Sequence, residues 1–256
     1  MQGEPAMRRA ALYIDGFNFY YGVRNHFRPG KEKRGFSLSG LVWCDFRALV
    51  ERHFLEPDTR LYLIRYFTAP VTEGVEARKD EHERYQLWLR AAGTIPGLKP
   101  VFGYYRTAEG ALREEKETDV NIAVEMLLDG AGKRYDTAYV LSGDTDQIPA
   151  VAAAAFRLGA PRRVRVLVPP AQSTESWQRH YLSYMQQLKK RFEIPKPEPR
   201  QVDVMPLTEE ILANSLLGYD LPEAPCPPYW RLPGHYLDGM CRPEWRPDTG
   251  FARAAL

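Results

Sequence analysis

Cysteine and histidine patterns that hold zinc are absent from this sequence. Its three cysteines, Cys44, Cys226 and Cys241, form no CxxC pair, and its five histidines form no spaced pair. The sequence therefore offers no tetrahedral zinc site of the common kinds. The small, odd number of cysteines also favours a reducing, cytoplasmic compartment over a secreted fold held by disulfides.

Long apolar runs and a charge excess of one sign are lacking as well. The 256 residues include 35 Lys and Arg against 33 Asp and Glu, a formal net charge of +2. Contact with a nucleic acid must then come from local patches rather than from overall charge. No stretch approaches the roughly 20 apolar residues of a membrane span, and the opening residues MQGEPAMRRAALYIDG lack a secretory apolar region. We expect no membrane partner.

Short apolar and β-branched segments alternate with helical patterns along the first three quarters of the chain. Such alternation predicts a three-layer α/β fold with a mainly parallel sheet and right-handed crossovers. The predicted strands are residues 10–14, 61–67, 99–105, 138–141 and 164–168, and the predicted helices are residues 45–53, 75–92, 116–128, 145–158 and 173–192.

The composition changes after residue 193, where prolines become frequent. We divide the chain into a domain at 8–193 and a proline-rich C-terminal arm at 194–256. The arm carries Trp230, Tyr236 and Trp245, which a free linker does not need. We therefore expect it to pack on the core or on a partner, and a homo-oligomer formed through it is one such arrangement.

Acidic residues follow two of the predicted strands directly. Asp15 ends the first strand, and Asp144 and Asp146 follow the fourth in the sequence LSGDTD. Parallel strands place their carboxyl ends at one edge of the sheet, where ligand sites form in open α/β folds. These three acids are therefore expected to meet in space.

A fourth acid, Asp119, is predicted to join them from the helix KETDVNIAVEMLLDG. On a period of 3.6 residues it shares a face with Ala123, Met126 and Leu127, which is the apolar face that packs on the sheet. Converging carboxylates repel one another unless their pKa values rise or a cation binds. An all-oxygen ligand set without His or Cys favours Mg²⁺ or Mn²⁺.

Each acid also has a purely structural explanation. Asp15 and Gly16 can form a strand-ending turn, with Asn18 as a helix N-cap. Asp144 can cap a helix starting at Thr145, and Asp119 can interact with the positive end of its helix. For phosphate contacts, Lys31, Lys33 and Arg34 in the loop of residues 28–40 are better candidates than the arginines of GAPRRVRV, because that loop leaves from the Asp15 edge.

Three motifs, YIDGFNFYYG, KETDVNIAVEMLLDG and LSGDTDQIPAV, resemble those of the NYN domain, a branch of the PIN-like nucleases. The resemblance covers residues 12–168. It implies a PIN-like Rossmannoid fold, a Mg²⁺ or Mn²⁺ site and hydrolysis of RNA. Two positions depart from the family pattern: Gln147 stands where an aromatic is usual, and Glu125 where an aspartate is usual.

The resemblance also implies roles for individual residues. Asp15, Asp119 and Asp144 would hold the metal, and Asp146 would complete the catalytic cluster. The residues expected to contact the substrate are Asn18, Lys116, Ser142 and Thr145. The predicted function is a metal-dependent ribonuclease that acts on single-stranded RNA and cuts it internally.

Other classes of function fit the sequence less well. An RNA-binding or assembly module without turnover is the main alternative, favoured by the near-neutral charge and the aromatic, proline-rich arm. A phosphatase needs a second aspartate two residues after Asp15, where Phe17 stands. A topoisomerase-like site needs a glutamate in place of Asp15.

Overall fold

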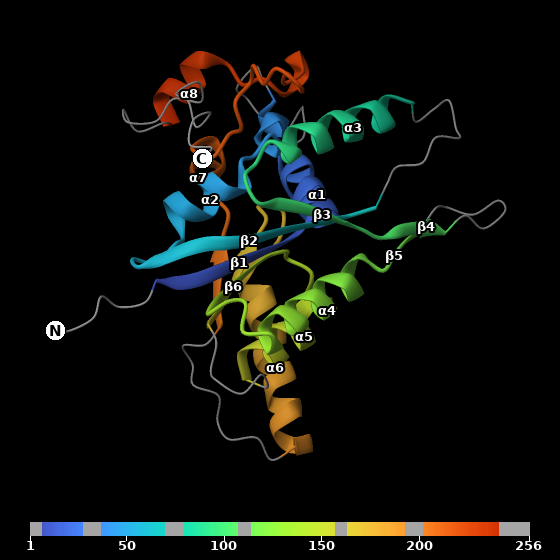
Figure 1. The fold of residues 1–256 in the computed structure, drawn as a ribbon, viewed down its shortest axis with the longest axis vertical. Coiled ribbons are helices and arrows are strands. Elements are labelled where there is room, and N and C mark those ends of the chain that lie inside the picture. Colours follow the sequence, from blue (N-terminus) through green and yellow to red (C-terminus); the bar gives the residue numbers. More distant parts are fainter. Residues whose placement is uncertain are drawn as a thin grey trace.

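The computed structural model describes residues 7–27, 37–69, 79–106, 114–156, 163–192 and 202–240. Its centre is a six-stranded parallel sheet in the order β3-β2-β1-β6-β7-β8 (Figure 1). A separate antiparallel pair, β4 with β5, forms a two-stranded sheet. The strands are β1 (Arg8–Asp15), β2 (Thr59–Thr68), β3 (Leu98–Phe102), β4 (Tyr104–Arg106), β5 (Glu114–Lys116), β6 (Thr137–Leu141), β7 (Arg163–Val168) and β8 (Val202–Pro206).

Helices cover both faces of the large sheet, so that the molecule has three layers (Figure 1). One face carries α1 (Gly16–His26), η1 (Leu38–Val42), α2 (Phe46–His53), α3 (Lys79–Gly93), α7 (Glu209–Ala213), η4 (Pro228–Trp230) and α8 (Gly234–Met240). The other face carries α4 (Thr118–Ala131), η3 (Thr145–Gln147), α5 (Ile148–Phe156) and α6 (Thr174–Phe192). The predicted three-layer α/β fold is confirmed.

The central strand β1 shows why its sequence is apolar without interruption. Ala10, Leu12 and Ile14 belong to the core on the α1 side, whereas Ala11 and Tyr13 belong to the core on the α4 side. Successive side chains of a strand point to opposite faces, and here both faces are covered by helices. A continuous apolar run is therefore required.

All five predicted strands are present, but the prediction listed neither α1 nor the C-terminal elements β8, α7 and α8. It also began a helix at residue 116, where Lys116 instead ends β5 and α4 starts at Thr118. The segment Val202–Pro206 pairs in parallel with β7 as an edge strand. Prolines surround it in the sequence, and an edge strand tolerates a proline at its end because that residue need not donate to a neighbour. The predicted strand 99–105 is divided between β3 and β4.

Residues 207–240 of the C-terminal arm pack on the α1 face of the sheet. Trp230 lies against Trp43, with ring centroids 5.7 Å apart, and the Trp43 indole donates to the Gly218 carbonyl at 3.2 Å. Gly40 allows this close approach, because a Cβ at that position would lie only 2.1 Å from the Trp230 carbonyl oxygen. The sheet and core thus continue past residue 193, and the division into two domains stays a prediction. Among the described residues, no helix has the length and apolarity to cross a bilayer.

A buried ionic network joins α4 to the sheet. The Asp129 side chain is 1% exposed and accepts two hydrogen bonds from Arg65 of β2, at 2.9 and 3.0 Å. Tyr13 of β1 and Arg134 also donate to this carboxylate, each at 2.9 Å. Burial raises the pKa of Asp129, but the hydrogen bonds from these partners outweigh it and lower the pKa below its usual range. The network fixes α4 against β1 and β2.

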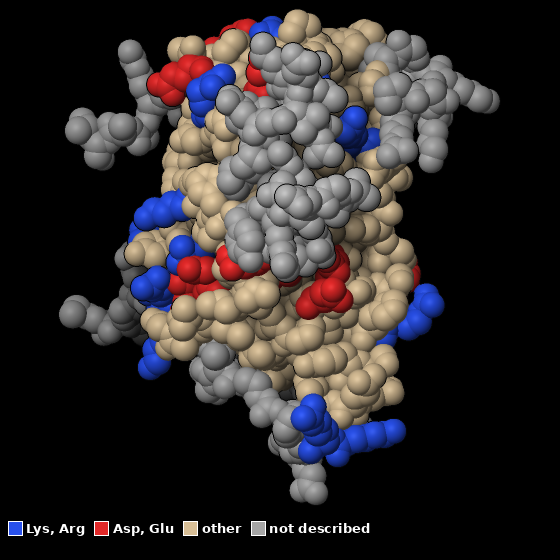
Figure 2. Space-filling model, turned by 90° about the vertical axis from the view of Figure 1, so that its right-hand side faces the viewer, with Lys and Arg blue, Asp and Glu red and all other residues tan. Residues whose placement is uncertain are grey.

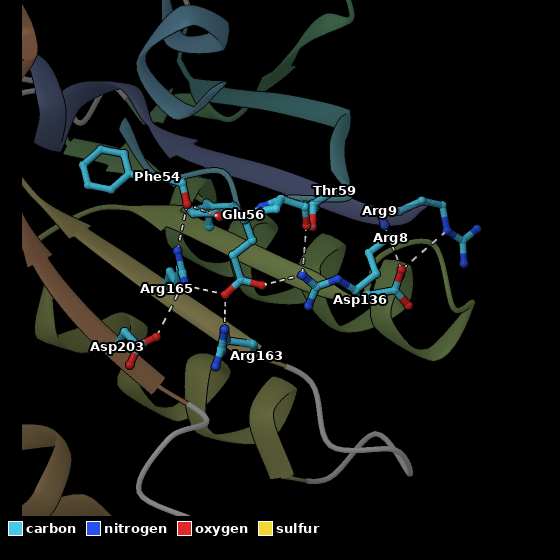
Figure 3. Close-up of polar contacts among 11 residues, drawn as sticks. Arg8, Arg9, Phe54, Glu56, Thr59, Asp136, Arg163, Arg165 and Asp203 are labelled. Atoms are coloured by element: carbon cyan, nitrogen blue, oxygen red, sulfur yellow. Dashed lines mark hydrogen bonds and ion pairs between the residues drawn. The ribbon is translucent and has the colours of Figure 1, made fainter. Parts of the chain in front are cut away.

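A second ionic cluster lies at the amino-terminal edge of the sheet (Figure 3). Glu56, which is 14% exposed, accepts from Arg8 at 2.9 Å and also from Arg163 and Arg165 of β7. Arg165 in turn lies 3.6 Å from Asp203 of β8. Burial raises the pKa of Glu56, but the three guanidinium groups outweigh it and hold the pKa below 4.5. The cluster ties β1, β7 and β8 to the loop before β2.

A Glu56→Gln variant is expected to lose about 2 kcal/mol of unfolding free energy at pH 7, because three arginines lose their shared countercharge. Since the pKa of Glu56 is lowered on folding, its stabilisation is present above the ordinary pKa of 4.5 and is lost as pH falls through the folded pKa. Urea unfolding over a pH series measures this. The difference between wild type and variant should shrink as the solution is acidified, and a constant difference would contradict the assignment.

Candidate functional site

The carboxyl ends of β1 and β6 form the centre of the candidate site. These strands are hydrogen-bonded neighbours, with Ile14 opposite Leu141, so that Asp15 and Ser142 follow side by side. Helix α1 begins immediately after Asp15, and η3 begins immediately after Asp144. Two helix amino termini therefore open at the same edge, where their free amide groups favour negative charge.

Asp15 is held rigidly at this edge and is only 5% exposed. One carboxylate oxygen accepts from the Asn18 amide at 2.9 Å, which makes Asp15, and not Asn18, the N-cap of α1. The other oxygen accepts from the Ser142 hydroxyl at 3.0 Å. The Asn18 side-chain oxygen accepts from the Gly143 amide at 2.8 Å. These bonds join the ends of β1 and β6.

Asp144 is positioned from three sides. Its amide donates to the Ser142 hydroxyl at 3.1 Å, and one carboxylate oxygen accepts from the Asp146 amide at 2.9 Å, as an N-cap of η3. The Trp177 indole of α6 donates to the Asp144 carbonyl at 3.2 Å. The Ser142 hydroxyl thus links Asp15 to Asp144, and it is itself 1% exposed.

Asp119 reaches the cluster from α4, although the predicted geometry of its helix was partly wrong. The buried side chains are Thr118, Ile122 and Met126, while Asp119 is exposed at the border of that face. Apolar residues also occupy the outer face of α4, so the pattern did not distinguish the two sides. One Asp119 oxygen nevertheless accepts from the Gln147 side-chain amide at 3.0 Å, which ties α4 to η3.

The electrostatics of Asp119 identify its neighbours. Although the residue as a whole is exposed, partial burial of its carboxyl group raises its pKa most, the negative charges of Asp144 and Asp146 raise it too, and the hydrogen bond from Gln147 opposes these effects. The hydrogen bond with Gln147 and these charge effects place Asp119 near η3 and the end of β6. Figure 2 views this edge and shows acidic side chains across the middle of the face, with the basic side chains mostly towards its margins.

The donor set of the site suits a divalent cation only if water completes the coordination. Within the described ranges, no three His, Cys, Asp or Glu side chains are arranged to hold a metal directly. Of the buried side-chain oxygens that have no hydrogen-bond partner among the described residues, three belong to residues of this region: Thr118, which precedes Asp119 in the sequence, Gln147, and Gln172, which lies against Gly143. Acceptors left unpaired next to mutually repelling carboxylates fit a hydrated cation, since Mg²⁺ keeps several of its waters.

The remaining predicted site residues, Thr145, Asp146 and Lys116, differ in how far the structure describes and exposes them. Thr145 is half-buried as the first residue of η3, and Asp146 is exposed beside it. The backbone of Lys116 ends β5, but its side chain lies outside the described part of the chain, as do residues 28–36 of the predicted basic loop. Sequence reasoning missed Gln172 and Trp177 as partners of the site, because nothing local distinguishes them from other polar and aromatic residues.

A parallel α/β sheet with acids at its carboxyl edge has the architecture of the PIN-like class of folds. The model of the NYN domain family matches residues 9–183, and the chain belongs to that family. It is 26% identical over 215 residues to 6-hydroxy-3-succinoylpyridine 3-monooxygenase HspA of Pseudomonas putida S16, covering 69% of this chain and 64% of that protein. This chain therefore spans less than two thirds of that relative.

One solved structure resembles the fold more loosely. The crystal structure of a protein of unknown function from Vibrio parahaemolyticus superposes with a TM-score of 0.46 at 13% identity. The superposition covers 81% of this chain and 97% of the other.

Proposed function

We propose that this protein is a metal-dependent ribonuclease that hydrolyses phosphodiester bonds of RNA. The observation that carries the proposal is the meeting of acids from three distant segments at one sheet edge. Asp15 and Asp144 are linked through the Ser142 hydroxyl, and the charge of Asp144 acts on Asp119. Membership of the NYN family supports the same conclusion, because that family has a nuclease-type fold.

The residues divide into those that hold a cation and those that order the site. Asp15, Asp119 and Asp144 would hold Mg²⁺ or Mn²⁺, directly or through water. When bound, such an ion activates a water and neutralises charge on the phosphate oxygens. Asp146, exposed beside Asp144, would accept a proton from or orient the attacking water.

The neutral side chains of the site would position the carboxylates and the substrate. Ser142 and Asn18 hold the carboxylates and the backbone of Gly143 in place through the hydrogen bonds described above. Thr145 and Lys116 would contact the substrate backbone. We further propose that the substrate is single-stranded, that cutting is internal and that the enzyme works in the cytoplasm, where the free thiols of Cys44 and Cys226 stay reduced.

Removal of the metal tests this proposal. Single-stranded RNA carrying a different fluorophore at each end is incubated with the protein in Mn²⁺, in Mg²⁺ and in excess EDTA. We expect cleavage with either metal, no cleavage in EDTA, and recovery when Mn²⁺ is added back. A single internal cut gives two labelled fragments whose lengths add up to that of the substrate, whereas cutting from an end releases labelled mononucleotides. Intact RNA in every metal condition would refute the catalytic assignment.

A non-catalytic RNA-binding module is the second candidate. It is favoured by the structural role that Asp15 and Asp144 already have as helix N-caps. One carboxylate oxygen of each accepts a hydrogen bond from a backbone amide. Fluorescence anisotropy with the same RNA separates the two functions. Binding that survives in an Asp15→Asn/Asp144→Asn double variant, without cleavage by either protein, would establish the binding module.

A further inference from the structure

The outer face of α4 carries an unusual row of exposed apolar side chains. Val120 is 62% exposed, Val124 46% and Leu128 62%. Residues four apart are neighbours on a helix surface, so these three form one stripe about 12 Å long. The buried side chains Ile122 and Met126 lie on another face of the same helix. Water-facing helix surfaces are normally polar, and a contiguous apolar stripe marks a contact surface.

The charges at the two ends of this stripe have opposite signs. Glu117 and Asp119 are exposed at the start of α4, and Lys133 is exposed just after its end, whereas the neighbouring Arg134 is paired with the buried Asp129. The nearby acid Asp136 is paired with Arg9, which leaves the second end basic. Glu125, on the flank of the helix, is paired with Arg65. An acidic end and a basic end joined by an apolar row are self-complementary under a two-fold axis.

We propose that α4 pairs in antiparallel orientation with α4 of a second copy of this chain. The two-fold axis passes Val124, so that Val120 of one copy packs on Leu128 of the other. Glu117 lies seven residues before Val124 and Ala131 seven residues after it, which brings Lys133 of the partner subunit within reach of Glu117. The helix dipoles also oppose one another in this arrangement. A parallel pair would instead place like charges together.

The pairing would bring positive charge from the second copy towards the acidic candidate site. Asp119 lies at the same end of α4 as Glu117, although on another side of the helix, so Lys133 of the partner subunit brings positive charge to the end of α4 that adjoins the acidic edge. This consequence rests on the proposed function, because that group would then attract the phosphates of the RNA. The pairing itself does not depend on it.

The interface is small, and the dimer is expected to be weak. One helix from each copy with three apolar side chains buries less than the roughly 1,000 Å² of a stable complex. We therefore expect a dimer that dissociates in the micromolar range. Sedimentation velocity of the full chain over a concentration series should show the weight-average mass rising from the 29.4 kDa of the monomer towards twice that value.

A Val124→Asp variant tests the surface, because it places two like charges at the two-fold axis. We expect the dimer to weaken at least tenfold, roughly the effect of opposed like charges in an interface. Val124 is exposed, so the thermal unfolding of the variant should match that of wild type. The matched control is Leu182→Asp on α6, where the leucine is 55% exposed and outside the stripe. That variant should dimerise as wild type does.

Charge reversal tests the antiparallel orientation. Lys133→Glu should weaken the dimer, and adding Glu117→Lys in the same chain should restore it. A wild type that stays monomeric at every concentration would overturn the proposal, as would a dimer that Val124→Asp leaves intact. Failure of the double reversal to restore the dimer would overturn the antiparallel arrangement. All of these readouts are masses, so they are independent of whether the protein cleaves RNA.

Discussion

An Asp144→Asn variant should cleave RNA about two to three orders of magnitude more slowly than wild type, the range found when one preorganised electrostatic group is removed. Asparagine has the shape of aspartate and is an equally good N-cap, so the hydrogen bond from the Asp146 amide can persist. The fold is therefore preserved while one negative charge of the site is lost. Single-turnover cleavage in Mn²⁺ measures the effect on the chemical step.

A matched control exists elsewhere in the same chain. Asp45 caps α2 by accepting from the Ala48 amide at 3.0 Å, which is the role that Asp144 plays for η3. The charges that act on Asp45 come from Arg52 and Glu51, and not from the acids of the site. Asp45→Asn should therefore cleave as wild type does. Equal rates for Asp144→Asn and wild type would show that Asp144 is a cap only.

Replacing the buried Asp129 by alanine should lower the unfolding free energy by about 3–5 kcal/mol, the cost of removing one partner from a buried ion pair. The loss is large because Arg65, 14% exposed, would keep its charge without the carboxylate that receives two of its hydrogen bonds. Tyr13, which is fully buried, would also lose its hydroxyl acceptor. Urea unfolding at pH 7 measures the change.

Two single variants separate the contributions to this network. Arg134→Ala should cost less than about 1 kcal/mol, because its side chain is 60% exposed and water screens the pair. Tyr13→Phe removes one hydrogen bond but leaves the ion pair, and about 1 kcal/mol is expected. A loss for Asp129→Ala no larger than that for Arg134→Ala would show that the remaining ion pair of Arg65 with Glu125 is enough to compensate its charge.

The elements of the site could be predicted because their signals are local. The apolar run of β1 ends in Asp15, and the run of β6 ends just before Ser142 and Asp144. A parallel sheet places both ends at one edge, whatever the rest of the fold does. The helix start at Asp45 and the glycine at the end of α3 are equally local features. Short-range sequence patterns were therefore sufficient to predict that Asp15 and Asp144 follow neighbouring strand ends.

Partners far apart in the chain could not be predicted in this way. The bond between Gln147 and Asp119 spans 28 residues, and that between Arg65 and Asp129 spans 64. In the sequence, Asp129 resembles an ordinary helix-end acid, although packing of α4 on β2 buries it even more deeply than Asp15, at 1% exposed against 5%. Such pairings depend on how layers stack, which no local period encodes.

The sequence by itself determined the parallel α/β class, the acidic strand ends and the family motifs, because each follows from residues within a few positions of one another. Only the tertiary structure decided that β8 completes the sheet and that Asp15 caps α1. It also decided which face of α4 meets the sheet, since apolar residues lie on both sides of that helix. These outcomes required long-range packing, where burial of one face leaves the other free.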